Sequence, residues 1–89
     1  MKLTMREWAE LDAIAWFMQS PVCQKQGIIQ KRGRHASTTA LAQRGLVRWK
    51  SAGRMFITRH GRAALATKTR RFLDYARKIA ERDYPADEA

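Results

Sequence analysis

The stretch TTALAQRGLVRWKSAGRMFITRHGRAAL, residues 38–65, decides the fold. Its first part has helical spacing and ends at Gly45, where a glycine suits a left-handed helix C-cap. Residues 46–50 then alternate between apolar and charged side chains, 51–53 read as a turn, and 55–57 form a second apolar run, which together predict a β-hairpin. Thr58 is placed to cap a following helix. The stretch therefore predicts a helix, a two-stranded ribbon and a second helix.

The same residues resemble a known pattern. The runs Leu41-Ala42-Gln43-Arg44-Gly45-Leu46-Val47 and Ile57-Thr58-Arg59-His60-Gly61-Arg62-Ala63-Ala64-Leu65 are similar to the LxxRGLV … LTxxGRxAL pattern of small bacterial and phage winged-helix proteins, among them MarR-like and PadR-like regulators. The resemblance implies a mainly α fold with a small β-hairpin, that is, a winged helix-turn-helix with a C-terminal helix. It also implies DNA binding in transcription regulation, although winged helices serve as protein-binding modules too.

The segments before this stretch complete one small domain. Thr4 and Glu7 have the spacing of a capping box, and a wide apolar stripe that follows them predicts a core helix. The stripe consists of Trp8, Leu11, Ile14, Ala15, Phe17 and Met18. Ser20 and Pro21 suit the start of a further helix, which is short and stops near Gly27. Residues 28–29 fit either a helical turn or a small strand beside the hairpin.

We expect a winged-helix domain over 1–66, a C-terminal helix over 67–84 and an acidic tail over 85–89. The helical pattern from Arg59 to about Asp83 has a break near 67–69. Leu65, Phe72, Ala76 and Ile79 form an apolar seam along it. Such a seam either folds back on the core or pairs with a second copy, in which case the protein is a homodimer.

The charge of the chain predicts a polyanionic partner. The formal net charge is +10, and no Asp or Glu occurs between Ala13 and Leu73. The basic residues in that segment are Lys25, Lys31, Arg32, Arg34, Arg44, Arg48, Lys50, Arg54, Arg59, Arg62, Lys68, Arg70 and Arg71. With no acid nearby they gain no local ion pair, and their field attracts nucleic acid. A solvated basic face kept for solubility is the less favoured interpretation, because ordinary surfaces mix both signs.

We predict that the helix near 36–44 enters the major groove of DNA, where hydroxyl side chains close to a helix N-terminus suit phosphates and base edges. The hairpin tip would reach the backbone or the minor groove. The candidate DNA contacts are Lys31, Arg32, Arg34, His35, Ser37, Thr38, Thr39, Gln43, Arg44, Arg48, Lys50, Arg54, Arg59, His60 and Arg62. The hydroxyls also have a plainer interpretation as helix caps. The prediction requires the positive charges to gather on one side and the helix's outer face to stay uncovered.

Catalytic and metal sites are not expected. Cys23 is the only thiol and His35 and His60 are the only histidines, so a Cys/His metal site lacks ligands. The middle of the chain has no carboxylates for acid–base chemistry, and its glycines are spaced as turns and caps. We therefore expect no enzyme and no cofactor. No apolar run reaches the length of a membrane span, and the N-terminus does not resemble a signal peptide, which favours a cytoplasmic protein.

The function expected from these features is binding of double-stranded DNA, sequence-specific or general, by a small transcriptional regulator of bacterial or phage type. The alternative is a winged-helix protein-interaction module, such as a phage inhibitor or an assembly factor, whose basic surface docks on an acidic protein or a ribonucleoprotein. RNA binding is a third alternative, because the same positive charge attracts RNA.

Overall fold

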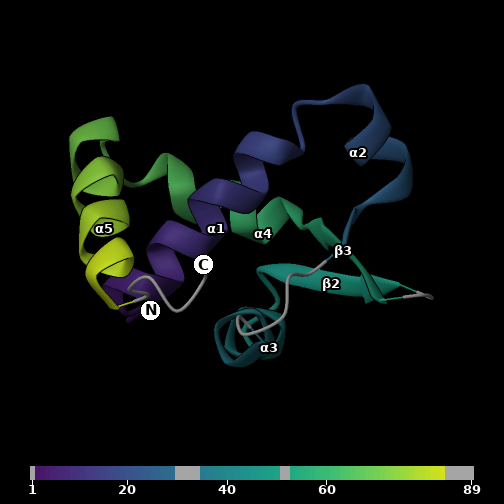
Figure 1. Cartoon of the computed structure of the whole chain (residues 1–89). Coiled ribbons are helices and arrows are strands. Elements are labelled where there is room, and N and C mark those ends of the chain that lie inside the picture. The colour runs from purple at the N-terminus through teal and green to yellow at the C-terminus, as the bar shows by residue number, and fades with distance from the viewer. Residues whose placement is uncertain (1, 30–34, 51–52, 84–89) are drawn as a thin grey trace.

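Helices form most of the chain, and a small antiparallel sheet lies at one end (Figure 1). The structure, a computed structural model, describes residues 2–29, 35–50 and 53–83, with the backbone alone at 29, 35–37 and 83. The elements are α1 (Met5–Phe17), α2 (Pro21–Gln26), β1 (Ile28–Ile29), α3 (His35–Gln43), β2 (Val47–Lys50), β3 (Arg54–Ile57), α4 (Arg59–Ala66) and α5 (Arg70–Asp83). None of the helices in the described part is long and apolar enough to cross a membrane.

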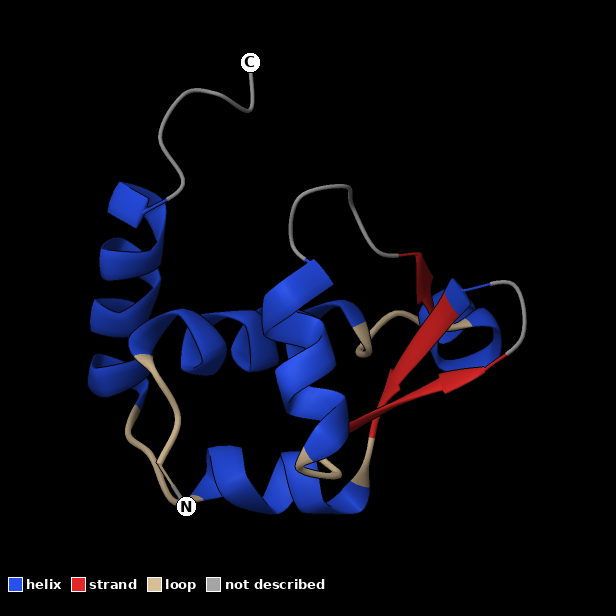
Figure 2. Cartoon of the chain, turned by 90° about the horizontal axis from the view of Figure 1, so that it is seen from below, coloured by secondary structure: helices blue, strands red, loops and turns tan. Residues whose placement is uncertain are grey.

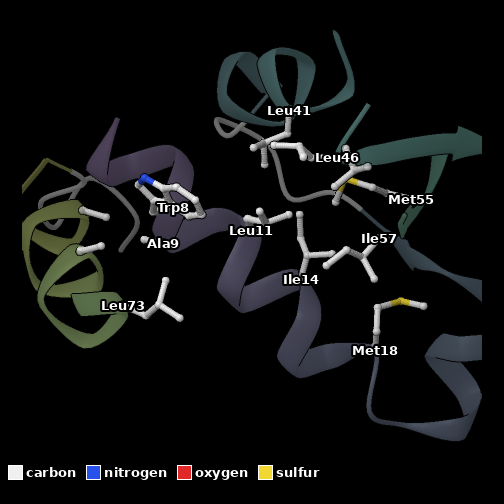
Figure 3. Close-up of a cluster of buried hydrophobic side chains, with 13 residues drawn as sticks. Trp8, Ala9, Leu11, Ile14, Met18, Leu41, Leu46, Met55, Ile57 and Leu73 are labelled. Carbon is white, nitrogen blue, oxygen red and sulfur yellow. The ribbon is translucent and has the colours of Figure 1, made fainter. Parts of the chain in front are cut away.

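Helix α1 is the centre of the core. Its capping box is confirmed: the Thr4 hydroxyl accepts from the Glu7 backbone N–H at 3.1 Å, and the Glu7 carboxylate accepts from the Thr4 N–H at 2.8 Å. Leu11, Ile14 and Met18 are buried toward α3 and the sheet, as Figure 3 shows. Each such side chain contributes about 1.5–3 kcal/mol by leaving water.

The structure corrects the prediction for Phe17, which was expected to lie in the apolar stripe of the core helix. Its side chain is 55% exposed, and that of Trp16 is 67% exposed. Phe17 lies about 120° around the helix from Leu11, because each residue of an α-helix advances by about 100°. It therefore falls outside the arc that α3 and the sheet cover.

The sheet has the strand order β1-β3-β2, and both pairings are antiparallel. Residues 28–29 thus form a strand, the second of the two alternatives that the sequence leaves open. The register places Val47 opposite Ile57, and both are buried against α1. Residues of β2 that alternate with Val47 point to the other face of the sheet. The hairpin therefore has one apolar face and one basic face.

The junction of α3, β2 and α4 is held by three hydrogen bonds around Thr58. Its backbone N–H donates to the Leu46 carbonyl at 3.0 Å, its hydroxyl donates to the Gly45 carbonyl at 2.6 Å, and the Gly61 N–H donates to that hydroxyl at 3.0 Å. Gly45 has φ +75°, as a left-handed C-cap requires. A Cβ at Gly61 would collide with the Leu46 carbonyl oxygen and lie 2.7 Å from Cγ1 of Ile57. Glycine at position 45 therefore ends α3, and glycine at position 61 allows the start of α4 to lie against the Leu46 carbonyl.

Helix α3 packs against α1 and β2 through Leu41 and Thr38, both fully buried. The two residues are three positions apart and therefore share the inner side of the helix. Thr38, predicted as a DNA contact, is thus part of the protein interior. Thr39, the next residue, is only half buried.

Helix α5 packs along α1, after a break at 67–69 that agrees with the predicted one. Leu73, Ala76 and Ala80 are buried in the core, and the Phe72 ring meets Trp8 edge-on at 6.0 Å between centroids. The seam predicted from Leu65, Phe72, Ala76 and Ile79 therefore folds back on the core. The homodimer predicted through this seam stays a prediction; within the chain, Ala76 is fully buried and the Phe72 ring contacts Trp8.

The protein has a mainly helical fold with an antiparallel hairpin and a C-terminal helix, arranged as in a winged helix. The helix before β1, α2, has only six residues, as the sequence indicates.

Gly61→Ala is expected to lower the free energy of unfolding by about 2 kcal/mol, because the collision with Leu46 outweighs the better helix propensity of alanine. Gly45→Ala is the matched control: it strains a positive φ but meets no atom within 4 Å, so a smaller loss of about 1 kcal/mol is expected. Urea unfolding of both variants measures the difference. A loss for Gly61→Ala no larger than that for Gly45→Ala would contradict the tight junction.

Thr38→Ala is expected to lower the free energy of unfolding by about 1–2 kcal/mol, because it removes a buried hydroxyl and leaves its surroundings less well packed. Thr39→Ala, on the neighbouring position, should change stability by less than about 0.5 kcal/mol. Thermal melts followed by circular dichroism compare the two. Equal stabilities for the two variants would show that Thr38 is not an interior residue.

Candidate nucleic-acid interface

The described acidic residues are confined to one part of the fold, whereas basic residues occur both there and elsewhere. Every acidic residue in the described part of the chain belongs to α1 or α5, namely Glu7, Glu10, Asp12, Asp74, Glu81 and Asp83. The elements from α2 to α4 carry none. Four of the acids, Glu10, Asp12, Asp74 and Glu81, line the cleft between α1 and α5, and the sheet lies at the end of the molecule opposite α5 (Figure 1).

The outer face of the hairpin is basic and exposed. Arg48 and Lys50, which we call the wing cations, alternate along β2 with the core residue Val47 and are exposed. The Lys50 ammonium lies 4.8 Å from the centroid of the Phe56 ring on the same face. Such a contact orients the side chain and leaves its charge in water. The wing cations can therefore reach an anion in solvent.

Arg54, a predicted DNA contact, is engaged within the fold. Its guanidinium donates to the Gln26 carbonyl at 3.2 Å and thereby fastens β3 to the end of α2. Lys25, which is exposed, is not among the predicted contacts, yet it lies three residues before Ile28 of β1 and is therefore close to the sheet. The sequence offered residues 28–29 either as a strand or as a helical turn, and only the strand gives Lys25 this position.

The described part of α3 presents fewer predicted contacts than expected. Gln43 and Arg44 are exposed, Thr39 is half buried and Thr38 is interior. Arg44 donates to the Lys2 carbonyl and so ties the end of α3 to the N-terminal segment. A guanidinium has five N–H donors, which leaves others for a ligand. The side chains of His35 and Ser37, together with the whole of Lys31, Arg32 and Arg34, lie outside the described residues.

The start of α4 adds a second group of cations. Arg59, His60 and Arg62 are all exposed. Arg59 and Arg62 are three residues apart and share one side of the helix. The bond from Thr58 to Gly45 fixes this helix start beside the end of α3, where Arg44 lies. Arg44, which follows α3, therefore lies near the start of α4 although it is fifteen residues before Arg59.

The basic residues at the start of α5 have a different environment. Arg70 donates to both oxygens of Asp12, at 3.2 and 2.5 Å, and to Asp74 at 3.1 Å. The hydrogen bond with Asp12 is the main reason that the pKa of Arg70 is raised above its ordinary value. The Lys68 ammonium lies 5.1 Å from the Trp8 ring centroid and 4.9 Å from that of Phe72. These residues stabilise the α1–α5 pair.

Arg70 also corrects a sequence expectation. The segment 13–73 has no acids, so its cations were expected to lack ion pairs, yet Arg70 finds Asp12 across 58 positions. The positive charges of the segment therefore do not all gather on one side. The acidic tail at 85–89, against which the outer face of the helix was required to stay uncovered, lies outside the described residues; α5 itself packs on α1 and lies apart from α3 in both views (Figures 1 and 2).

Comparison with known proteins assigns no family. No protein-family model, no curated protein and no solved structure matches this chain. The resemblance to winged-helix regulators therefore stays a hypothesis that depends on the residue pattern of 41–65 and on the chain's own fold.

Proposed function

We propose that this protein binds double-stranded DNA through α3, the β2–β3 hairpin and the start of α4, as a small transcriptional regulator of bacterial or phage type. The observation that carries the proposal is the separation of charge. The exposed cations of α2, the hairpin and α4 lie on elements that contain no acid, and the described acids are confined to α1 and α5. Such a one-signed surface attracts the phosphate backbone.

The α3 helix, the β2–β3 hairpin and the start of α4 together form what we call the winged part, and its geometry suits a duplex. A single α-helix fits the major groove, and a two-stranded ribbon beside it can follow the backbone. The exposed wing cations, Arg48 and Lys50, would contact phosphates on one side of the groove, and Arg59 and Arg62 those near the end of α3. Phosphate contacts of this kind fix the position of the protein on DNA, whereas base contacts from α3 would supply sequence preference.

The junction around Thr58 supports the proposal energetically. It links α3, β2 and α4 by hydrogen bonds from the Thr58 backbone and hydroxyl, so the groups that would contact DNA are held in a fixed relation before binding. Preorganised groups lose less conformational freedom on association, and more of the contact energy then appears as affinity.

A protein-interaction role has one observation in its favour. The large apolar side chains of Trp16, Phe17 and Val22 are each more than half exposed, at 67%, 55% and 61%. Trp16 and Phe17 line the cleft between α1 and α5, and Val22 lies on α2, whereas the wing cations lie on β2. The two roles would use different surfaces, so Trp16→Ser should leave duplex affinity unchanged if DNA binds as proposed.

The wing cations test the proposal. Arg48→Gln/Lys50→Gln should weaken binding to a short duplex and lower the slope of log K against log salt by about 1.8, because each lost phosphate contact removes about 0.9. Fluorescence anisotropy over a series of salt concentrations measures both effects. Arg77→Gln, an exposed cation beside the acids of the α1–α5 cleft, is the control and should leave the slope unchanged.

Two results would overturn the proposal. One is wild-type protein whose duplex affinity is absent or does not depend on salt. The other is a loss of affinity in Arg77→Gln as large as that in the wing variant, which would show that net charge alone, and no particular surface, attracts DNA.

A further inference from the structure

Helix α5 has three distinct sides. One side packs on α1 through Leu73, Ala76 and Ala80. A second side, with Arg70, Asp74, Arg77 and Glu81, lines a cleft of about 580 Å³ between α1 and α5. The third side, which we call the outer face of α5, consists of Arg71, Tyr75, Lys78 and Arg82, all exposed.

The outer face is continuous along the helix. Its residues are separated by four, three and four positions, which places them on one side. From Arg71 to Arg82 the face extends for about 16 Å, at about 1.5 Å per residue. Tyr75, 54% exposed, lies between the cations with its hydroxyl available to an oxygen acceptor. No acidic residue belongs to this face.

The cations of the outer face make no ion pair with a described residue, although partners are available at helical spacing. Asp74 is four residues before Lys78, and Glu81 is three after it, the separations at which helix ion pairs form. Asp74 instead accepts from Arg70 at 3.1 Å, and both acids line the cleft. Asp74 and Glu81 therefore lie on the cleft side of α5, and the outer face carries positive charge.

This face lies far from the wing cations. Helix α5 is at one end of the molecule and the hairpin at the other, and Figures 1 and 2 show the same separation from two directions. The molecule measures 33 × 31 × 24 Å, and α1 with its core lies between these ends. A duplex on the hairpin would therefore leave the outer face of α5 exposed to solvent.

We propose that the outer face of α5 is a second surface for double-stranded DNA, so that one protein molecule holds two duplex segments together. This inference rests on the proposed function. Arg71, Lys78 and Arg82 would contact phosphates, and Tyr75 would donate its hydroxyl to a phosphate or sugar oxygen. Contacts of this kind carry no base preference, so the second duplex is bound without regard to its sequence.

A duplex suits this face better than a lipid surface. Interfacial helices insert a broad apolar face into the membrane, but the apolar side of α5 is occupied by α1. What remains outside is three cations and one tyrosine, which match an array of phosphates by charge and by hydrogen bonding.

The test uses the full-length protein, a bead-tethered duplex and a fluorescent free duplex. Wild-type protein should retain the free duplex on the beads. Arg71→Gln/Lys78→Gln should reduce that retention about tenfold, yet bind a single short duplex within about twofold of wild type, because the wing is intact. Arg77→Gln on the same helix is the control and should retain the free duplex as wild type does. Equal melting temperatures would confirm that the variants are folded.

Three outcomes overturn the inference. Wild type that binds a single duplex but retains no second one refutes it and leaves the proposed function standing. Equal retention by Arg71→Gln/Lys78→Gln assigns bridging to another surface. The third outcome is that wild type sediments with anionic phosphatidylserine vesicles and the double variant does not, while neither bridges two duplexes. That result assigns the face to membranes. Wild type that binds no duplex in anisotropy refutes the proposed function itself.

Discussion

The close approach of α4 to the Leu46 carbonyl is the constraint on which the winged part depends. Without a Cβ at Gly61, the backbone of α4 can reach this oxygen, and Thr58 can then bond to Gly45, Leu46 and Gly61 at once. The three bonds join the end of one helix, the start of a strand and the start of another helix. In a protein with few core residues, such hydrogen bonds define the angles between elements that packing alone would leave loose.

Charge and packing are arranged together around α1. One side of this helix carries the core that α3 and the sheet complete, and another side receives α5. Acids of both helices line the cleft between α1 and α5. There Asp12 and Asp74 form ion pairs with Arg70. These exposed ion pairs contribute little stability on their own. Their larger effect is on the surface, since they draw the negative charge to the α1–α5 cleft and leave the winged part with cations alone.

Local features of the fold could be predicted from the sequence, and long-range ones could not. The Thr4 capping box, the Gly45 cap and the break at 67–69 depend on neighbouring residues, and the structure confirms each. The burial of Thr38, the exposure of Phe17 and the fold-back of the apolar seam depend on which side of each helix meets another element. Periodicity gives the apolar arc of a helix but not its partner. The candidate surface follows the same division: the cations were visible in the sequence, whereas the pairing of Arg70 with Asp12 and the engagement of Arg54 with Gln26 required the tertiary contacts.

The position of α5 bears on how such a small protein could act on DNA. An apolar seam on a C-terminal helix can pair two copies of a chain, but here Ala76 and Phe72 already pack on α1. Pairing through this seam would expose the core and forfeit its burial energy. The same packing that removes the seam from the surface turns Arg71, Lys78 and Arg82 outward. If the chain holds two segments of DNA, the fold supplies both surfaces within one copy, at opposite ends of α1 and its core.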